Sequence, residues 1–376
     1  MKKITAFIKK ETVLCIAAAL AFFSVFWVAP DKQYLEYIDF RTLSLLFCLM
    51  GVMSGLQNLG VFEWIAVKML GRVKSTGALT GILIFLCFFF GMLITNDVAL
   101  ITFVPFTFTV LKLLGEEKRE RLLVPVVAMQ TIGANLGSML TPVGNPQNLY
   151  LYDKSGMSLG AFIGLMLPYT AAAFLLLCGF CLVQGRRTPK ELKILLPKQD
   201  GLGGKEKKLA VYLLLFLLAL ACVVRAVPYP VMLAVTVLVI FCMDREVLGR
   251  VDYSLLLTFI CFFVFIGNMG RIPAFSDFLG SVVSGNEVYV AILSSQLISN
   301  VPAALLLSGF TDNFRDLVVG VDLGGLGTLI ASMASLISYK YVAREASEKK
   351  KGFLMYFTLG SICFLAVLVL LYEIIA

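Results

Sequence analysis

The sequence predicts an all-α polytopic membrane protein with two inverted-topology repeats, each holding a re-entrant helical hairpin and a broken transmembrane helix. Three observations predict this fold. Hydrophobic residues make up 59% of the 376 residues and charged residues 15%, whereas about a quarter of an ordinary soluble domain is charged. Apolar stretches of about 20 residues, long enough to cross a bilayer, recur along the chain. Polar motifs interrupt two such stretches at matching places in the two halves.

The first apolar stretches predict two spans and a short surface helix. Four lysines occur in the first ten residues, and a span over 12–28 follows. That segment has no small-residue cleavage site, so we expect a first span rather than a signal peptide. A second span is predicted over 42–59. The apolar stretch 62–70 is too short to cross and is predicted to lie at the membrane interface.

A polar motif divides the apolar run from Gly77 to Leu114 at its centre, where the residues are Thr95, Asn96 and Asp97. Lipid offers no hydrogen bonds to Asn or Asp, so these side chains must face protein or a water-filled cavity. The run is therefore predicted to form a hairpin that enters the membrane and returns, with its tip at 95–97.

The next segment, 122–152, is long enough to cross the membrane but is interrupted by glycines, prolines and amides, which predicts a broken helix. A span over 159–183 and a basic, hydrophilic linker over 185–208 follow. We take that linker as the boundary between an N-terminal half, 1–184, and a C-terminal half, 209–376.

The C-terminal half repeats the same features in the same order. After a pair of spans at 209–224 and 231–243, a second and shorter hairpin is predicted with its tip at 299–301, and a second broken helix over 317–338. Basic residues collect on one side of the resulting layout, which places the N-terminus in the cytoplasm. The two repeats then have opposite orientations in the inner or plasma membrane.

A hairpin tip opposite a broken helix brings free backbone groups together, where carbonyl oxygens can bind a cation and helix N-termini can bind an anion. This predicts two mirror-related groups of substrate- or ion-binding residues. The first comprises Thr95, Asn96, Asp97, Asn135, Gly137, Thr141, Gly144, Asn145, Gln147 and Asn148, and the second Ser299, Asn300, Gly325, Gly327 and Thr328. Na⁺ is expected at Thr95, Asn96 and Gly137 and at Ser299, Asn300 and Gly327. Helix packing is the alternative for any single glycine.

Asp97 is the sharpest candidate, because an ionisable side chain at membrane depth is functional by default. Its counterpart in the second tip is Val301, so its role belongs to one repeat only. No Lys or Arg falls near the predicted membrane centre. The chain has no histidine and one isolated carboxylate at this depth, which argues against an intramembrane enzyme. The net charge of +8 is attributed to cytoplasmic loops rather than to nucleic-acid binding.

Three motifs resemble the ion transporter superfamily: ITNDVAL at 94–100, TPVGNPQN at 141–148 and SQLISNVP at 295–302. That group includes arsenite permeases, citrate-transporter-like proteins, sodium/proton antiporters and divalent-anion/sodium symporters. The resemblance covers nearly the whole chain. It implies inverted repeats, two re-entrant hairpins and alternating access.

The resemblance also carries ligand roles to Asn96 and Asn300, because each tip of the divalent-anion symporters reads Ser-Asn-Thr. The third tip position departs from that pattern, with Asp97 in one tip and Val301 in the other. This departure makes dicarboxylate binding of the symporter kind doubtful and is closer to the arsenite-permease and antiporter members.

We therefore expect a secondary active transporter for a small inorganic or carboxylate anion, coupled to Na⁺ or H⁺, with no other cofactor and no enzymatic activity. A Na⁺/H⁺ antiporter that uses Asp97 is the alternative. Occluding hairpins suit alternating access better than a passive channel. The sequence leaves open the substrate, the coupling ion, symport against antiport, and the formation of a homodimer.

Overall fold

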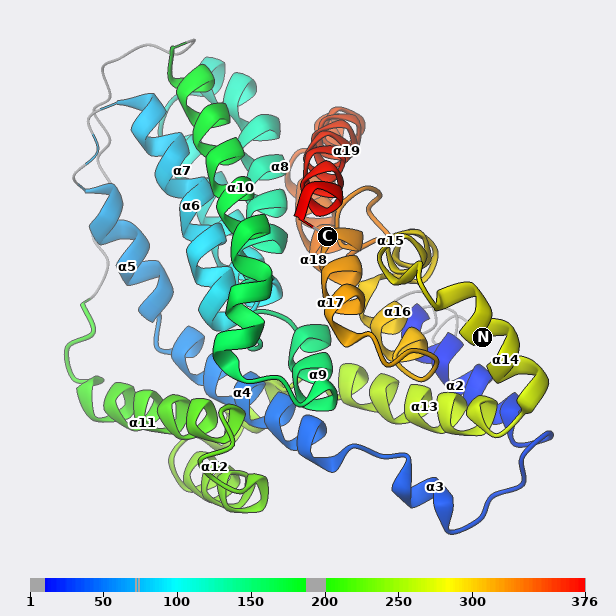
Figure 1. The fold of residues 1–376 in the computed structure, drawn as a ribbon. Helices are drawn as coiled ribbons and strands as arrows, with labels where there is room; N and C mark the ends of the chain where they lie inside the picture. The colour runs from blue at the N-terminus through cyan, green and yellow to red at the C-terminus, as the bar shows by residue number, and fades with distance from the viewer. Residues whose placement is uncertain (1–10, 72, 74, 187–200, 376) are drawn as a thin grey trace, which may run out of the picture.

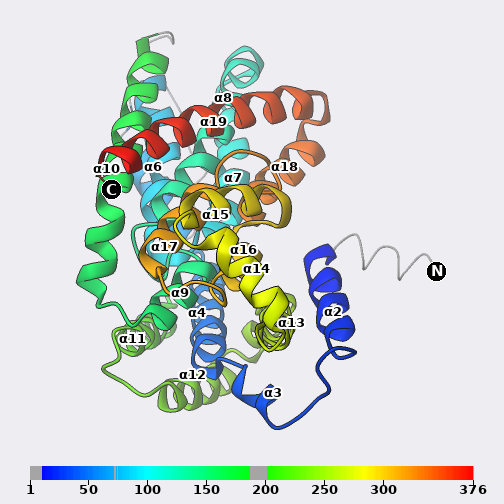
Figure 2. The same cartoon turned by 45° about the vertical axis from the view of Figure 1, so that its right-hand side comes forward.

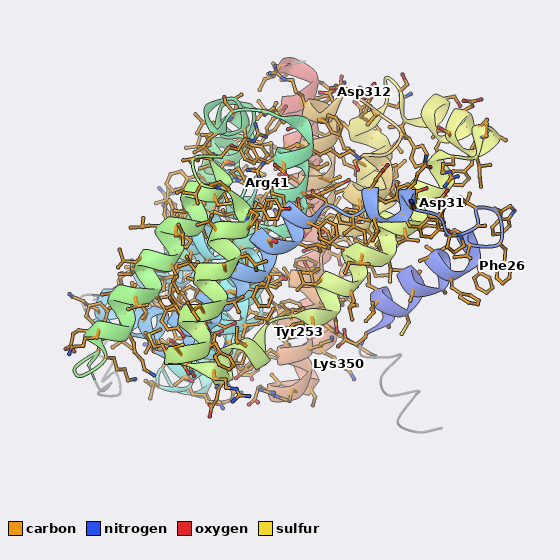
Figure 3. All side chains as sticks on the ribbon, turned by 90° about the horizontal axis from the view of Figure 1, so that it is seen from below. Phe26, Asp31, Arg41, Tyr253, Asp312 and Lys350 are labelled. Atoms are coloured by element: carbon orange, nitrogen blue, oxygen red, sulfur yellow. The ribbon has the colours of Figure 1, made fainter. Side chains whose placement is uncertain are left out.

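The computed structural model describes residues 11–71, 73, 75–186 and 201–375, and these ranges are helical with no strand. Large apolar side chains cover the outer surface, as Phe26 does with 73% of it exposed (Figure 3). Five helices in these ranges are long and apolar enough to cross a membrane: α4 (Phe40–Asn58), α6 (Thr76–Ile94), α10 (Leu159–Arg186), α13 (Tyr253–Gly270) and the stretch Ser347–Ile375, which contains η2 (Ser347–Lys349) and α19 (Lys350–Ile375). The predicted class, an all-α polytopic membrane protein, is confirmed.

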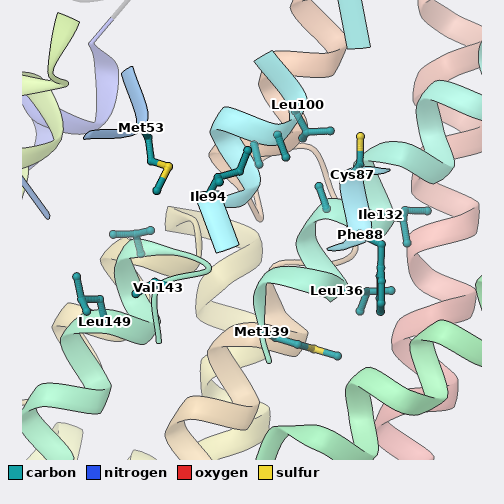
Figure 4. Close-up of a cluster of buried hydrophobic side chains, with 14 of the residues drawn as sticks. Met53, Cys87, Phe88, Ile94, Leu100, Ile132, Leu136, Met139, Val143 and Leu149 are labelled. Carbon is teal, nitrogen blue, oxygen red and sulfur yellow. The ribbon is translucent and has the colours of Figure 1, made fainter. Parts of the chain in front are cut away.

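The first hairpin consists of α6 and α7 (Asn96–Lys112), which are separated by the single residue Thr95. α8 (Glu116–Ser138) packs against both arms, and α10 packs against α6 and α8 (Figure 1). Figure 4 shows Phe88 of α6 beside Ile132 and Leu136 of α8 within this buried cluster. The loop 139–145 then separates α8 from α9 (Pro146–Ser155), so the chain breaks inside the predicted broken helix.

The second hairpin has the same order of parts with shorter arms. α15 (Glu287–Ile298) and α16 (Asn300–Leu307) are separated by Ser299, and α17 (Phe314–Gly324) packs against both. The loop 325–332 separates α17 from α18 (Met333–Glu345). α19 follows and packs against α8 and α18, which joins the two hairpin units (Figure 2).

Helices from opposite ends of the chain pack together around the hairpins. The early helix α2 (Thr12–Ser24) lies along α13, whereas α11 (Glu206–Val223) and α12 (Tyr229–Met243) lie along the early helix α4 (Figures 1 and 2). At the first of these contacts, the buried Asn268 Nδ2 donates to Ser24 Oγ at 2.8 Å and to Tyr34 Oη at 2.8 Å. The two ends of the chain therefore form one connected framework.

Shorter elements complete the described chain: α3 (Gln33–Glu36), α5 (Val61–Leu70), η1 (Arg245–Arg250) and α14 (Pro273–Val283). Most of the predicted linker 185–208, the lysine-rich first ten residues and the basic Arg72 and Lys74 lie outside the described residues. The division into halves at that linker, the opposite orientation of the repeats and the depth of the hairpins in the bilayer remain predictions.

Candidate functional site

The two hairpin tips dock in the same way on the two loops that interrupt the broken helices. The backbone N–H of Asn96 donates to the carbonyl of Gly144 at 3.0 Å, and that of Asn300 donates to the carbonyl of Ala331 at 3.0 Å. Gly325 of the second loop lies against the Asn300 carboxamide, where a Cβ would come within 2.9 Å of Nδ2. Each predicted tip asparagine is thus joined to the loop beside it.

The two loops also fold alike. The N–H of Gly144 donates to the carbonyl of Thr141 at 3.2 Å, and the N–H of Ala331 donates to the carbonyl of Thr328 at 3.2 Å. These matching turns set a register between the two broken helices, in which Thr141 corresponds to Thr328.

In that register, Asn135 of α8 corresponds to Asp322 of α17. Asn135 joins the first tip to the second broken helix: its Oδ1 accepts from Asn96 Nδ2 at 3.0 Å and from the Ser332 hydroxyl at 3.0 Å. Its Nδ2 donates to Ser335 Oγ at 3.2 Å. All of these side chains are buried, so the network fixes the position of both breaks.

Asp322 makes the reciprocal connection to the first broken helix. Its Oδ1 accepts from Asn145 Nδ2 at 3.2 Å, and Asn145 Nδ2 also lies 3.2 Å from Ser138 Oγ. Asn145 Oδ1 caps α9 by accepting from the N–H of Asn148 at 2.9 Å. The side chains of Gln147 and Asn148, both buried, lie beside the Asp322 carboxyl.

The expectation of one isolated carboxylate in the site is therefore wrong, because Asp322 is only 4% exposed. The sequence around Asp322 is apolar and glycine-rich, and Asp322 was not among the predicted site residues. The signal that could have found it is the threonine at the start of each loop. Aligning Thr141 with Thr328 places an aspartate opposite Asn135.

A cavity of about 370 Å³ reaches the first tip. Its lining includes residues at the N-terminal ends of three helices: Thr95 and Asp97 at α7, Asn145 and Pro146 at α9, and Met333 at α18. Helix N-termini carry partial positive charge, but the first-turn N–H groups of Asn96, Asp97 and Val98 in α7 already donate within the protein. The helix dipoles at this end of the cavity favour an anion, whereas the carboxyl group of Asp97 lines the same end.

Charged residues from other elements line the same cavity, namely Arg250, Asp252 and Lys340. The sequence placed no basic side chain near the membrane centre, yet Arg250 and Lys340 reach the cavity that contains the tip. Arg250 is the last residue of η1, and Lys340 lies in the middle of α18.

Two predicted residues of the first group fasten this region to α6. A Cβ on Gly137 would collide with the backbone carbonyl of Phe88, so Gly137 allows close packing of α8 on α6. The Thr141 hydroxyl donates to the carbonyl of Met92 at 2.5 Å, which ties the first loop to the same helix. Gly137 therefore has a packing role, the alternative noted for single glycines.

The second loop is held by Gln296 of α15, which we did not single out from the sequence. Its Nε2 donates to the carbonyls of Gly324 at 3.0 Å and Leu326 at 2.9 Å, and its Oε1 accepts from the N–H of Thr328 at 2.9 Å. Gly327, with φ 110°, lies against the same carboxamide. Gly327 and the exposed Thr328 thus contact Gln296, whereas Ser299 and Asn300 contact Ala331.

Comparison with known proteins places this chain in a family. A family model described as a citrate transporter matches residues 4–313. The chain belongs to the citrate transporter family. This family falls within the ion transporter superfamily, so the resemblance of the three motifs is confirmed, and the protein is a multi-pass membrane transporter by family.

Members of similar length include an uncharacterized transporter, MJ0456, of Methanocaldococcus jannaschii, which is 32% identical over 83% of this chain and 84% of its own length. The inner membrane protein YbiR of Escherichia coli is 32% identical over 88% of this chain and 86% of its own. The silicon efflux transporter LSI3 of rice is 31% identical over 38% of this chain and 28% of its own.

Proposed function

We propose that this transporter is a secondary active carrier that moves a small anion or oxyanion by alternating access, coupled to a gradient of Na⁺ or H⁺. The observation that carries the proposal is the cavity lined by the N-termini of α7, α9 and α18. Arg250 and Lys340 add positive charge to the same cavity. Amides and half-helix N-termini at membrane depth are the usual means by which carriers hold anionic groups.

Two corresponding positions on α9 and α18 support the alternating-access part of the proposal. In the register of the two broken helices, Asp153 of α9 corresponds to Lys340 of α18. Asp153 forms an ion pair with Arg41 of α4, which also donates to the carbonyl of Cys222 at 3.0 Å. Lys340 lines the open cavity with Asp252, and no ion pair joins these two in the described structure. The protein is thus closed at Asp153 by an ion pair, whereas the corresponding position, Lys340, lines an open cavity.

The relatives set only a broad substrate class. The family description refers to citrate, and the name of the rice relative refers to silicon. We therefore propose a small carboxylate or inorganic oxyanion, carried in the inner or plasma membrane with the N-terminus in the cytoplasm.

A cation/proton antiporter is the second candidate, and one observation favours it. Asp97 lines the cavity together with Asp252, so two carboxyl groups face the same space. In this alternative, Na⁺ and H⁺ compete for Asp97, and the Na⁺ sites expected at the two tips serve exchange rather than symport.

Flux into proteoliposomes separates the two. Purified protein is reconstituted, and uptake of labelled citrate, succinate, phosphate and silicate is followed under imposed Na⁺ or pH gradients. Accumulation of one of these solutes above its outside concentration supports the carrier. If Na⁺ exchanges for H⁺ while no anion is taken up, and Asp97→Asn abolishes that exchange, the anion carrier is wrong and the antiporter stands.

A further inference from the structure

Two buried side-chain oxygens beside α9 have no hydrogen-bond donor. They are Asp322 Oδ2 and Asn148 Oδ1. The other carboxyl oxygen of Asp322 accepts from Asn145 Nδ2 at 3.2 Å. Asn148 is fully buried, and its Nδ2 faces the carbonyls of Ser138 and Met139, each at 3.4 Å. Each of these two oxygens thus lacks a hydrogen bond of normal geometry, which native interiors rarely tolerate, although the amides of Asn148 and Gln147 lie beside the Asp322 carboxyl group.

The charge of an ionised Asp322 would also lack a counter-ion. No ion pair involves Asp322 in the part of the chain that the structure describes. The helices packed against α17 carry their charged residues toward the helix ends, and α16 carries none. These residues are Glu287 on α15, Asp153 and Lys154 on α9, the Glu116–Arg121 segment on α8, Arg186 on α10, and Lys350, Lys351 and Glu373 on α19. A buried carboxylate without a cation is costly, so a bound cation or a proton is required.

A proton fits this place better than a metal ion. One proton on Asp322 Oδ2 turns that atom into a donor, and Asn148 Oδ1 is an acceptor that needs one. A hard metal cation collects about six oxygen ligands, whereas only these two side-chain oxygens are unpartnered here. The neighbouring carbonyls of Ser138 and Met139 already accept from Asn148.

Asn145 connects the acid to the cavity, because this residue lines the cavity and its Nδ2 donates to Asp322. The corresponding position in the first repeat differs. There the residue is Asn135, whose Oδ1 is satisfied by both Asn96 and Ser332. The unsatisfied acid therefore occurs in one repeat only.

We propose that Asp322 is the proton-coupling residue of this carrier, and that its proton is shared with Asn148 and exchanged with the cavity past Asn145. Loading transfers a proton from cavity water to Oδ2 and leaves a neutral carboxylic acid. Unloading returns the proton to water and leaves the carboxylate. The inference rests on the proposed carrier function, and it narrows the coupling ion to H⁺.

Infrared spectroscopy of the purified protein in lipid tests the proton directly, without any transport. At neutral pH we expect a carbonyl band of a protonated carboxylic acid in the wild type, and we expect Asp322→Asn to remove it. The matched control is Glu287→Gln, since Glu287 is also a buried acid but accepts from the Thr311 hydroxyl at 2.9 Å. A band that survives Asp322→Asn, or the absence of any such band, overturns the proposal.

A second measurement tests the competing Na⁺ site and the role in coupling. Addition of Na⁺ at constant pH should change the thermal unfolding temperature of the wild type and of Asp322→Asn by the same amount. If Na⁺ stabilises the wild type but not Asp322→Asn, the site binds Na⁺ and the proposal is wrong. In proteoliposomes, an inward proton gradient should accelerate substrate uptake at least about tenfold in the wild type and leave it unaccelerated in Asp322→Asn. Should the wild type carry no solute, the proposed function fails, while the infrared result still decides the protonation of Asp322.

Discussion

Thr95 and Ser299 end their hairpin arms in the same unusual backbone conformation, with φ 75°, ψ 147° at Thr95 and φ 72°, ψ 154° at Ser299. These angles lie close to a region that only glycine usually populates, and holding another residue there costs about 1–3 kcal/mol. Such strain persists where the surrounding structure imposes it, commonly at functional sites. Here the docking of Asn96 on Gly144 and of Asn300 on Ala331 imposes it.

The backbone strain at Ser299 can be tested by measuring the free energy of unfolding. Ser299→Gly removes the Cβ that makes this conformation unfavourable, whereas Ser299→Ala keeps it. We expect the free energy of unfolding of the glycine variant to be about 1 kcal/mol higher than that of the alanine variant. Thr109→Gly, at an exposed position inside α7, is the control and should lose about 0.3 kcal/mol, the difference between the helix propensities of threonine and glycine. Equal stability of the two Ser299 variants would show that the tip is unstrained.

Gly137 is predicted to act through packing rather than through a bound ion. Because its Cβ would collide with the carbonyl of Phe88, Gly137→Ala should destabilise the protein by about 1–3 kcal/mol. Gly164→Ala in α10, where nothing lies near the new Cβ, should be neutral or slightly stabilising. Thermal unfolding is measured with and without Na⁺. A loss at Gly137 that appears only when Na⁺ is present would instead support the Na⁺ site.

The ion pair between Arg41 and Asp153 is predicted to hold one end of the carrier closed. Arg41→Ala leaves the mostly buried Asp153 without its partner and should destabilise the protein by about 1–3 kcal/mol, a value reduced for the partial exposure of both side chains. Asp153→Ala should cost a similar amount, and the double variant less than the sum of the two. Additive losses in this double-mutant cycle would mean that the pair contributes no coupling energy.

Lys340 is predicted to attract the anionic substrate into the cavity. Lys340→Gln should raise the KM for uptake about tenfold, which corresponds to about 1.4 kcal/mol of lost binding. Lys118→Gln, in the first turn of α8, is the matched control and should leave KM unchanged. An unaltered KM in Lys340→Gln would show that this side chain does not contact the substrate.

Local chemistry explains which parts of the fold were predictable. The break at Thr95 was predicted because a polar motif in an apolar run has few solutions in lipid, and the break at Ser299 follows the same logic. The helices α2, α4, α10, α11 and α12 match the predicted spans to within a few residues, since apolar length alone defines them.

The missed residues depend on contacts between distant parts of the chain. The structure reveals the role of Asp322 through its hydrogen bond with Asn145, and that of Gln296 through its hydrogen bonds to the second loop. Gly137 was grouped with ligands because its approach to Phe88 cannot be read from local sequence. Side chains that act across two repeats need the register between those repeats, and two weakly similar halves leave that register uncertain by several residues.

The central claim is gradient-driven movement of an anion through the cavity at the first tip. Its most direct test is uptake of the labelled solute panel into proteoliposomes, comparing the wild type with Asn96→Ala, which should lose the bond to Asn135. The account predicts saturable accumulation of one anion above its outside concentration in the wild type. At equal amounts of folded protein, the rate of uptake by the variant should be lower by at least about tenfold. Equilibration without accumulation, or accumulation that Asn96→Ala leaves unchanged, would contradict it.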